Sequence, residues 1–262
     1  MSFNPKPVKF PNKVTGKLRI GNTAADYGLY GTGTEQKFEL GTRYRVDDRV
    51  YRYGKAGGDC NSKKGAQNNN VWFGENTVAA SLVGDMYVTI TTDSTSGSVT
   101  TGFGVANNMV GGFFSQPDNT NAQWRRIEGH VAAPTGTTVK VYLDGPLTRA
   151  LPSGGAFAEW MHNPYSNLIN NGGVRVPVMG VPTTSIASGS YGWFQTWGPT
   201  WVGQNAAADF GGTYDQMATW TEGGNIADAN TNTNAQIAGY IVTKRAEGDW
   251  ANPPFLFLTI SP

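Results

Sequence analysis

Hydrophobic and polar residues alternate at every second position in many short segments of this chain. The segments Met86–Ile90, Val139–Leu143 and Ile237–Thr243 show this period most clearly. Such alternation is typical of β-strands that bury one face. Helical periodicity is not sustained over 12 residues anywhere in the sequence. The pattern therefore predicts an all-β chain.

The first strong signal lies between residues 42 and 53. Thr42–Val46 and Arg49–Tyr53 both alternate, and Asp47 and Asp48 separate them. Two turn-forming residues between two alternating runs predict a β-hairpin, although Asp-Asp is a weaker turn signal than Asn-Gly. We expect the hairpin to turn at Asp47-Asp48.

Further strands are expected along the rest of the chain. Residues 54–70 are rich in Gly, Asn and Lys and predict a polar loop. The run 150–168 contains Pro152 and Pro164, so it could hold only short helical turns. The other predicted strands are Trp124–Val131, Val176–Val181, Tyr191–Val202 and Phe255–Ile260.

Short strands at roughly 10-residue spacing indicate a β-barrel or β-sandwich with long loops. The run Asn170–Gly173 is the strongest turn signal of the chain and suggests a boundary. The expected organisation is an extended N-terminal arm (1–35), a β-rich subdomain (36–172) and a β-barrel-like subdomain (173–262).

The arm is predicted from the first 25 residues. Pro5, Pro7 and Pro11 disfavour helix and bias the preceding residues toward extended backbone. Five Lys or Arg residues and no acidic residue precede Asp26. Such a segment either frays or lies along another surface.

Charge is distributed unevenly along a chain whose formal net charge is only +1. Residues 1–64 hold 13 Lys and Arg against 6 Asp and Glu, a net +7, which leaves −6 for the remainder. A basic start could join one copy to the acidic body of a neighbour, or to another acidic surface, or it could be ordinary solvated charge.

Cys60 is the only cysteine, so no disulfide forms within the chain and assembly in a reducing cytoplasm is compatible with the sequence. The N-terminus lacks the apolar segment of a signal peptide, and no run reaches the ~18 apolar residues of a membrane helix. We expect neither export by a signal peptide nor insertion into a membrane.

No catalytic, cofactor or metal site is predicted. His130 and His162 are the only histidines and neither lies in a metal-binding motif, while Cys60 has no CxxC partner. The GxSxG elbow, the phosphate-binding loop and the dinucleotide fingerprint are absent, and Gly102–Gly104 is an isolated GxG. The sequence favours binding or assembly over catalysis.

A β-rich glycan hydrolase remains an alternative, because such enzymes need only two carboxylates beside aromatic walls. Specific nucleic-acid binding is not expected, since the near-neutral chain carries no recognised motif. The candidate carboxylates for a hydrolase are Glu159, Asp209, Asp215, Glu222 and Asp228.

The segment YGWFQTWGPTW (191–201) is the most distinctive of the chain. Tyr191, Trp193 and Trp197 fall on one side of a regular strand, so they could form a platform for a sugar or a protein partner. The alternative is that these rings fill a core. Trp201 follows Pro199, leaves the register and is expected to be exposed.

Several segments of the chain resemble segments of the virion proteins of tailed bacteriophages. In those proteins a strand, an acidic turn and a sequence like RYGKAGG occur near the N-terminus, and a pair of β-segments occurs at the C-terminus. The resemblance covers most of residues 36–262, and its motifs are compositional. Its segments are LGTRYRVDDRVYRYGKAGG (40–58), KVYLDGPLTRALPSG (140–154), NPYSNL (163–168), MGVPTTSIASGSYGWFQTWGPTWV (179–202) and IAGYIVTKRAEGDWANPPFLFLTI (237–260).

The resemblance implies a non-enzymatic capsid decoration (cement) protein, assembled in the host cytoplasm and resident in the virion. Its expected partner is the major capsid protein, and a homotrimer would match the three-fold positions of a shell. The alternatives are a glycan-binding phage surface module and the hydrolase. The candidate partner-binding residues are Lys6, Lys9, Phe10, Lys13, Lys17, Arg19 and Trp201.

Overall fold

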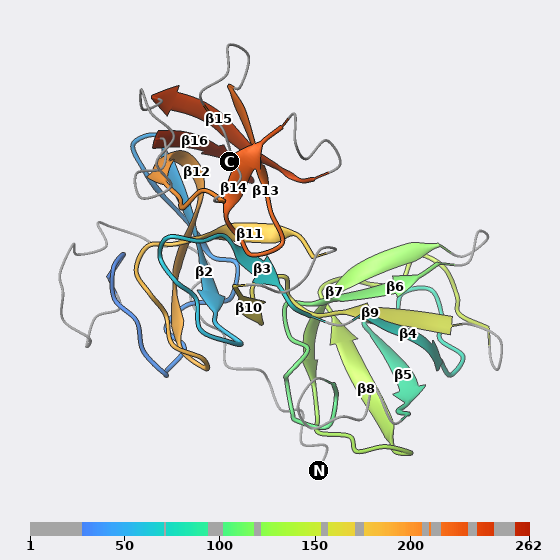
Figure 1. The fold of residues 1–262 in the computed structure, drawn as a ribbon. Coiled ribbons are helices and arrows are strands. Elements are labelled where there is room, and N and C mark those ends of the chain that lie inside the picture. The colour runs from blue at the N-terminus through green and yellow to red at the C-terminus, as the bar shows by residue number, and fades with distance from the viewer. Residues whose placement is uncertain are drawn as a thin grey trace. The chain divides into compact units, whose positions relative to one another are not determined.

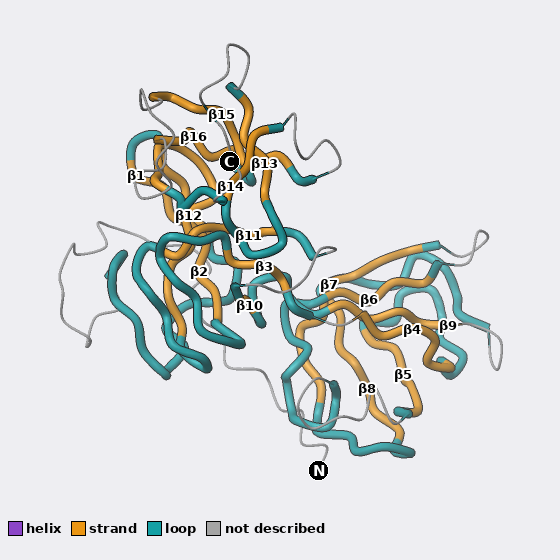
Figure 2. The backbone as a smooth tube through the Cα atoms, viewed as in Figure 1, coloured by secondary structure: helices purple, strands orange, loops and turns teal. Residues whose placement is uncertain are grey.

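All regular structure in the described part of the chain is β-strand, as Figure 2 shows. The computed structural model describes residues 28–70, 72–93, 102–117, 122–152, 157–170, 176–205, 210, 216–229, 235–243 and 255–262. They form two antiparallel curled sheets, which confirms the predicted all-β class. The chain divides into two compact units.

Unit 1 spans Asn70–Pro164 and contains a six-stranded sheet in the order β4-β9-β6-β7-β8-β5 (Figure 1). A bridge between Val78 and Ile90 links the chain after β4 to β5, so the two ends of this strand order approach each other. Its strands are β4 (Trp72–Thr77), β5 (Tyr87–Thr91), β6 (Phe113–Gln116), β7 (Gln123–His130), β8 (Thr138–Leu143) and β9 (Phe157–Met161).

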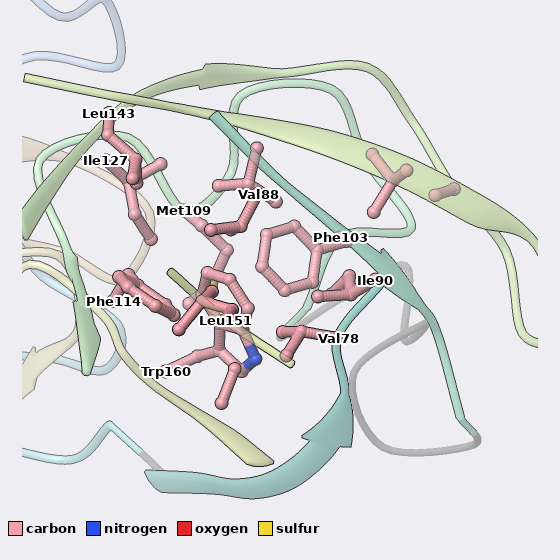
Figure 3. Packing of buried hydrophobic residues seen from close by; sticks show 14 of the residues in the cluster. Val78, Val88, Ile90, Phe103, Met109, Phe114, Ile127, Leu143, Leu151 and Trp160 are labelled. Atoms are coloured by element: carbon pink, nitrogen blue, oxygen red, sulfur yellow. The ribbon is translucent and has the colours of Figure 1, made fainter. Parts of the chain in front are cut away.

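The curled sheet of unit 1 encloses an aromatic and aliphatic core. The Trp160 ring packs edge to face on Phe103, with centroids 5.1 Å apart, and lies 5.2 Å from the Phe114 ring. Figure 3 shows these three side chains pointing toward one another, together with Val88 and Ile90 from β5. The strands contribute the inward residue of each alternating pair to this core, and loop residues such as Phe103 and Met109 complete it.

Of the described residues, unit 2 comprises 28–69 and those from Tyr165 onward, with a sheet in the order β10-β3-β11-β12-β16-β15-β13-β14. The hairpin β1–β2 pairs with β12 beside this path. Its strands are β1 (Arg43–Val46), β2 (Arg49–Lys55), β3 (Ala66–Asn68), β10 (Leu168–Ile169), β11 (Val178–Pro182), β12 (Tyr191–Trp201), β13 (Met217–Trp220), β14 (Ile226–Asp228), β15 (Ile237–Thr243) and β16 (Phe255–Thr259).

β12 is the central strand of unit 2 and is covered on both faces in its first half. Trp193 packs with Tyr51 and Tyr53 in one cluster, while Phe194 packs with Leu168 and others in a second. The pairing with β2 shifts between Gln195 and Trp197, so β12 contains a bulge. Beyond the bulge β12 pairs with β16.

The predicted hairpin is confirmed, because Val46 pairs with Arg49 across Asp47-Asp48, and Asp47 has a φ of 51°. The helical turns allowed for 150–168 do not occur among the described residues of that run. This run contains β9, which lies between β4 and β6, and β10. The polar loop 54–70 likewise contains β3, because pairing with β10 and β11 outweighs the low strand propensity of its residues.

The chain passes between the units at residues 69–70 and 164–165. Among the described residues, unit 1 is therefore one segment that interrupts unit 2. The predicted change of subdomain at 172–173 lies outside the described residues. The paired strands β3 and β10 bring the two passages together in unit 2, because Leu168 lies opposite Asn68. This long-range pairing has no local sequence signal. Most of the predicted arm, including all of residues 1–27, also lies outside the described residues.

Candidate functional site

Large apolar side chains project from one face of the four adjacent strands β12, β16, β15 and β13. The register places Trp201 opposite Phe255 and Tyr240 opposite Phe257. Met217 of β13 lies opposite Tyr240 on its other side. Since directly opposed residues share a face of a sheet, these five side chains form one surface, and Trp197 joins it through its ring contact with Phe257. We call it the aromatic face; it comprises Trp197, Trp201, Met217, Tyr240, Phe255 and Phe257.

The rings of the aromatic face are held by one another. Tyr240 stacks on Phe257 with centroids 5.0 Å apart and planes inclined by 8°. Trp197 meets the same Phe257 ring edge on, at 5.6 Å and 87°. Phe257 is thus packed from two sides, and such pairs contribute ~0.5–1.5 kcal/mol each beyond simple burial. The Trp197, Tyr240 and Phe257 rings are consequently held in place by contacts within the chain.

The opposite side of the same strands anchors the aromatic face to a core. Leu256 and Leu258 alternate with the outward phenylalanines of β16 and are fully buried. Gly239 lies opposite Leu258 with a φ of 152°, and an added Cβ would collide with the carbonyl oxygen of Phe257. Glycine therefore allows β15 to approach β16 at the point where Tyr240 stacks on Phe257.

The aromatic face is open to solvent. Tyr240 is 49 % exposed, Met217 45 %, Phe255 41 % and Trp201 38 %. At the ~150–250 Å² of a large side chain, these fractions leave on the order of 400 Å² of apolar surface. Patches of about this size on monomers are often functional. A standard interface takes ~800 Å² from each partner, so this face could supply about half.

Trp201 is the one predicted partner-binding residue within the described part of the chain, and its predicted exposure is confirmed. The predicted loss of register after Pro199 is wrong, because β12 continues to Trp201 and pairs in register with β16 up to Phe255. The Lys63 ammonium lies 5.5 Å from the centre of its ring, in cation–π contact. The Lys63 carbonyl also accepts a hydrogen bond from Gly203 N–H at 2.7 Å, which holds the loop beside β12. The other predicted residues, Lys6, Lys9, Phe10, Lys13, Lys17 and Arg19, lie outside the described residues.

The platform predicted on Tyr191–Trp201 divides into a buried and an open part. Trp193 is fully buried, with Phe38 at 5.3 Å and Tyr53 at 5.2 Å between ring centres. Trp197 is only half-buried, so the first ring belongs to the core and the second borders the aromatic face. Burial raises the pKa of Tyr51, in the same cluster as Trp193, to about 12. The Tyr51 hydroxyl therefore stays neutral at physiological pH.

The two histidines and the cysteine are buried. His130 Nε2 accepts a hydrogen bond from Met109 N–H at 3.1 Å, and Nδ1 donates to the Val131 carbonyl at 2.8 Å. Burial lowers the pKa of His130 to about 4 and raises that of Cys60 to about 12. His130 is therefore a neutral side chain packed against Phe103, at 4.8 Å.

The described candidate carboxylates of the hydrolase alternative are divided between the two units. Glu159 belongs to unit 1, whereas Glu222 and the buried Asp228 belong to unit 2. Asp209 and Asp215 lie outside the described residues. No group of three or more His, Cys, Asp and Glu side chains that could hold a metal ion occurs among the described residues.

Sequence reasoning missed most of the aromatic face. Tyr240 and Phe255 lie in correctly predicted strands, but their outward direction depends on pairing between β15 and β16 across residues 244–254. Met217 lies in β13, a strand that no alternation of polar and apolar residues predicted. The available signal was the presence of large apolar residues on both alternating sets of β16, FLFLT (255–259), which indicates a strand without a polar face.

Comparisons with protein-family models, with curated proteins and with solved structures find no match to this chain. Among the residues that the structure describes, none forms a helix long and apolar enough to cross a membrane.

Proposed function

We propose that this chain is a non-enzymatic virion structural protein that decorates and stabilises a phage capsid, with the aromatic face as its contact surface. The observation that carries the proposal is this ordered, exposed patch of rings on four paired strands. Interface cores are enriched in aromatic residues and methionine and depleted in charge, as this face is. The sequence resemblance to phage virion proteins supplies the partner, the major capsid protein.

The patch suits a decorating protein for a physical reason. On the order of 400 Å² of apolar surface gives a modest contact by itself, because association costs several kcal/mol of lost freedom. A symmetric shell repeats the same site many times, and a trimer engages several sites together, so weak contacts add through effective concentration. Protein–protein contact on this scale needs no catalytic centre.

The experiment compares shell binding by the full chain and by two variants of the aromatic face, Tyr240→Ser and Phe255→Ser. The solvent-exposed part of each ring is about 100 Å², worth ~2 kcal/mol at 25 cal/mol per Å². We expect each change to weaken co-sedimentation with empty shells of the source virus by about 10- to 50-fold.

The control is Trp124→Ser, which removes a more exposed ring from unit 1. It should leave shell binding unchanged. If the aromatic-face variants bind as well as the unmodified chain, or if the control loses binding to the same extent, this face is not the contact surface.

The predicted arm is tested separately, because its residues are not in the aromatic face. Deleting residues 1–25 should abolish shell binding if the basic segment clamps a neighbouring subunit. Circular dichroism and thermal unfolding of the truncated chain report whether the β-units stay folded. If the truncated chain is folded and binds shells as well as the full chain, the clamp is refuted. The role of the aromatic face is still tested by the Tyr240→Ser and Phe255→Ser variants.

A further inference from the structure

A second outward surface, in unit 1, combines aromatic rings with charged and hydroxyl groups. β6 lies between β9 and β7, and its outward residues Phe113 and Ser115 alternate with the buried Phe114 and Gln116. Ser115 pairs with Glu159 on one side and Trp124 on the other. A carboxylate, a hydroxyl and an indole thus stand in one row across three strands.

The neighbouring row completes this surface. Phe113 pairs with Met161 on β9 and with Arg126 on β7. Strands lie ~4.8 Å apart and alternate residues ~7 Å apart, so the two rows cover roughly 10 by 7 Å. That footprint matches one or two pyranose rings.

Trp124 presents an open ring in a fixed place. It is 64 % exposed, and it meets Phe113 at 5.8 Å with an interplanar angle of 65°. The strand beneath is held by side chains: Arg125 Nη1 donates to the Trp124 carbonyl at 2.6 Å, and Arg126 N–H donates to Asp144 Oδ1 at 3.0 Å. The indole is therefore in contact with Phe113, while most of its surface is open to solvent.

From this arrangement we infer that the surface formed by Trp124, Phe113, Ser115, Glu159 and Arg126 binds a neutral saccharide. A pyranose has an apolar C–H face edged by hydroxyl groups. The indole offers the apolar contact, the Glu159 carboxylate accepts charge-assisted hydrogen bonds, and the serine hydroxyl both accepts and donates hydrogen bonds.

The charge of unit 1 favours a neutral ligand over nucleic acid and over an acidic polymer. The paired rows hold one carboxylate and one guanidinium, which offset each other. Residues 70–164 hold four Lys and Arg against seven Asp and Glu, a net charge of −3. Nucleic acid binding depends on neutralising phosphates with cations, so this unit disfavours it. None of the six residues of the aromatic face of unit 2 has a carboxylate or guanidinium group that could orient sugar hydroxyls.

The experiment titrates the full chain with maltotriose, cellotriose and N-acetylchitotriose while the tryptophan indole N–H signals are followed by NMR. Because the surface is shallow, we expect dissociation constants in the millimolar range. At least one of the three sugars should shift the Trp124 indole signal, assigned through Trp124→Phe. Shifts caused by none of them, or shifts confined to other tryptophans, would overturn the proposal.

Three variants show whether the named groups make the contact. Trp124→Ala should weaken binding at least tenfold, and Glu159→Gln about tenfold, as expected for loss of a hydrogen bond to a charged group. Trp201→Ala in unit 2 is the matched control and should bind the sugar normally. Equal binding by Trp124→Ala and the unmodified chain would refute the site. Shell binding is unaffected by either outcome, so this proposal and the capsid proposal fail separately.

Discussion

Protonation of one buried histidine is expected to destabilise unit 1 in mild acid. His130 is fully buried, and its removal from water lowers its pKa from 6.5 to about 4. The hydrogen bond to the Val131 carbonyl raises this pKa and so partly opposes the shift, whereas nearby His162 lowers it further. The unfolded chain takes up this proton near pH 6.5, whereas the folded chain resists it until about pH 4. The stabilising effect is complete above pH 6.5 and is lost as the pH falls toward 4.

The size of the effect follows from the two pKa values. A difference between 6.5 and about 4 corresponds to about 3 kcal/mol over the whole range, of which about 2 kcal/mol is lost between about pH 7 and pH 5. The upper window is the useful one, because ordinary carboxylates titrate mostly below it. For a marginally stable domain this is a large fraction of the total.

The assay is urea unfolding at both pH values, followed by hydrogen exchange of peptides from β7. The unmodified chain should lose about 2 kcal/mol on acidification, and His130→Gln should lose much less, whatever its stability at neutral pH. His162→Gln is the control and should keep the dependence. An equal loss in His130→Gln, or direct NMR titration of the His130 ring near pH 6.5, would refute the reasoning.

Three further changes test the packing of unit 2. Gly239→Ala should lower the free energy of unfolding in urea by about 3 kcal/mol, because the new methyl group collides with the Phe257 carbonyl and the backbone conformation is strained for any residue other than glycine. Gly136→Ala is the control: it has open space around it and should lower the free energy of unfolding by only about 1 kcal/mol. Trp193→Ala should cost ~3–5 kcal/mol by emptying the cluster around the ring, and a drop below 1 kcal/mol would contradict its role in the core. Cys60, whose pKa burial raises to about 12, should resist iodoacetamide in the folded chain at mildly alkaline pH and react in urea; rapid labelling of the folded chain would refute its burial.

Local patterns predicted the strands whose two faces differ. β5 and β8 have a buried and a solvent-facing side, so Val88 and Val141 mark them by alternation alone. The hairpin at Asp47-Asp48 was predictable because its pairing is set by a two-residue turn. In each case the information lies within about ten residues of sequence.

Strands defined by distant partners were not predictable. Residues Ala66–Asn68 have poor strand propensity and form β3 only because β10 and β11 pair with them across a hundred residues. The aromatic face shows the same limit, since Trp201 was predicted to be exposed but its neighbours Phe255 and Tyr240 come from strands paired much later in the chain. An outward ring and a core ring look alike in sequence until the register is known.

The central claim is that this chain attaches to a viral shell. Its most direct test is mass-resolved sizing of the purified chain, alone and mixed with empty shells of its source virus, together with the melting temperature of those shells. The account predicts a trimer that sediments with the shells and raises their melting temperature. A chain that stays monomeric and leaves both the sedimentation and the melting of the shells unchanged would contradict it.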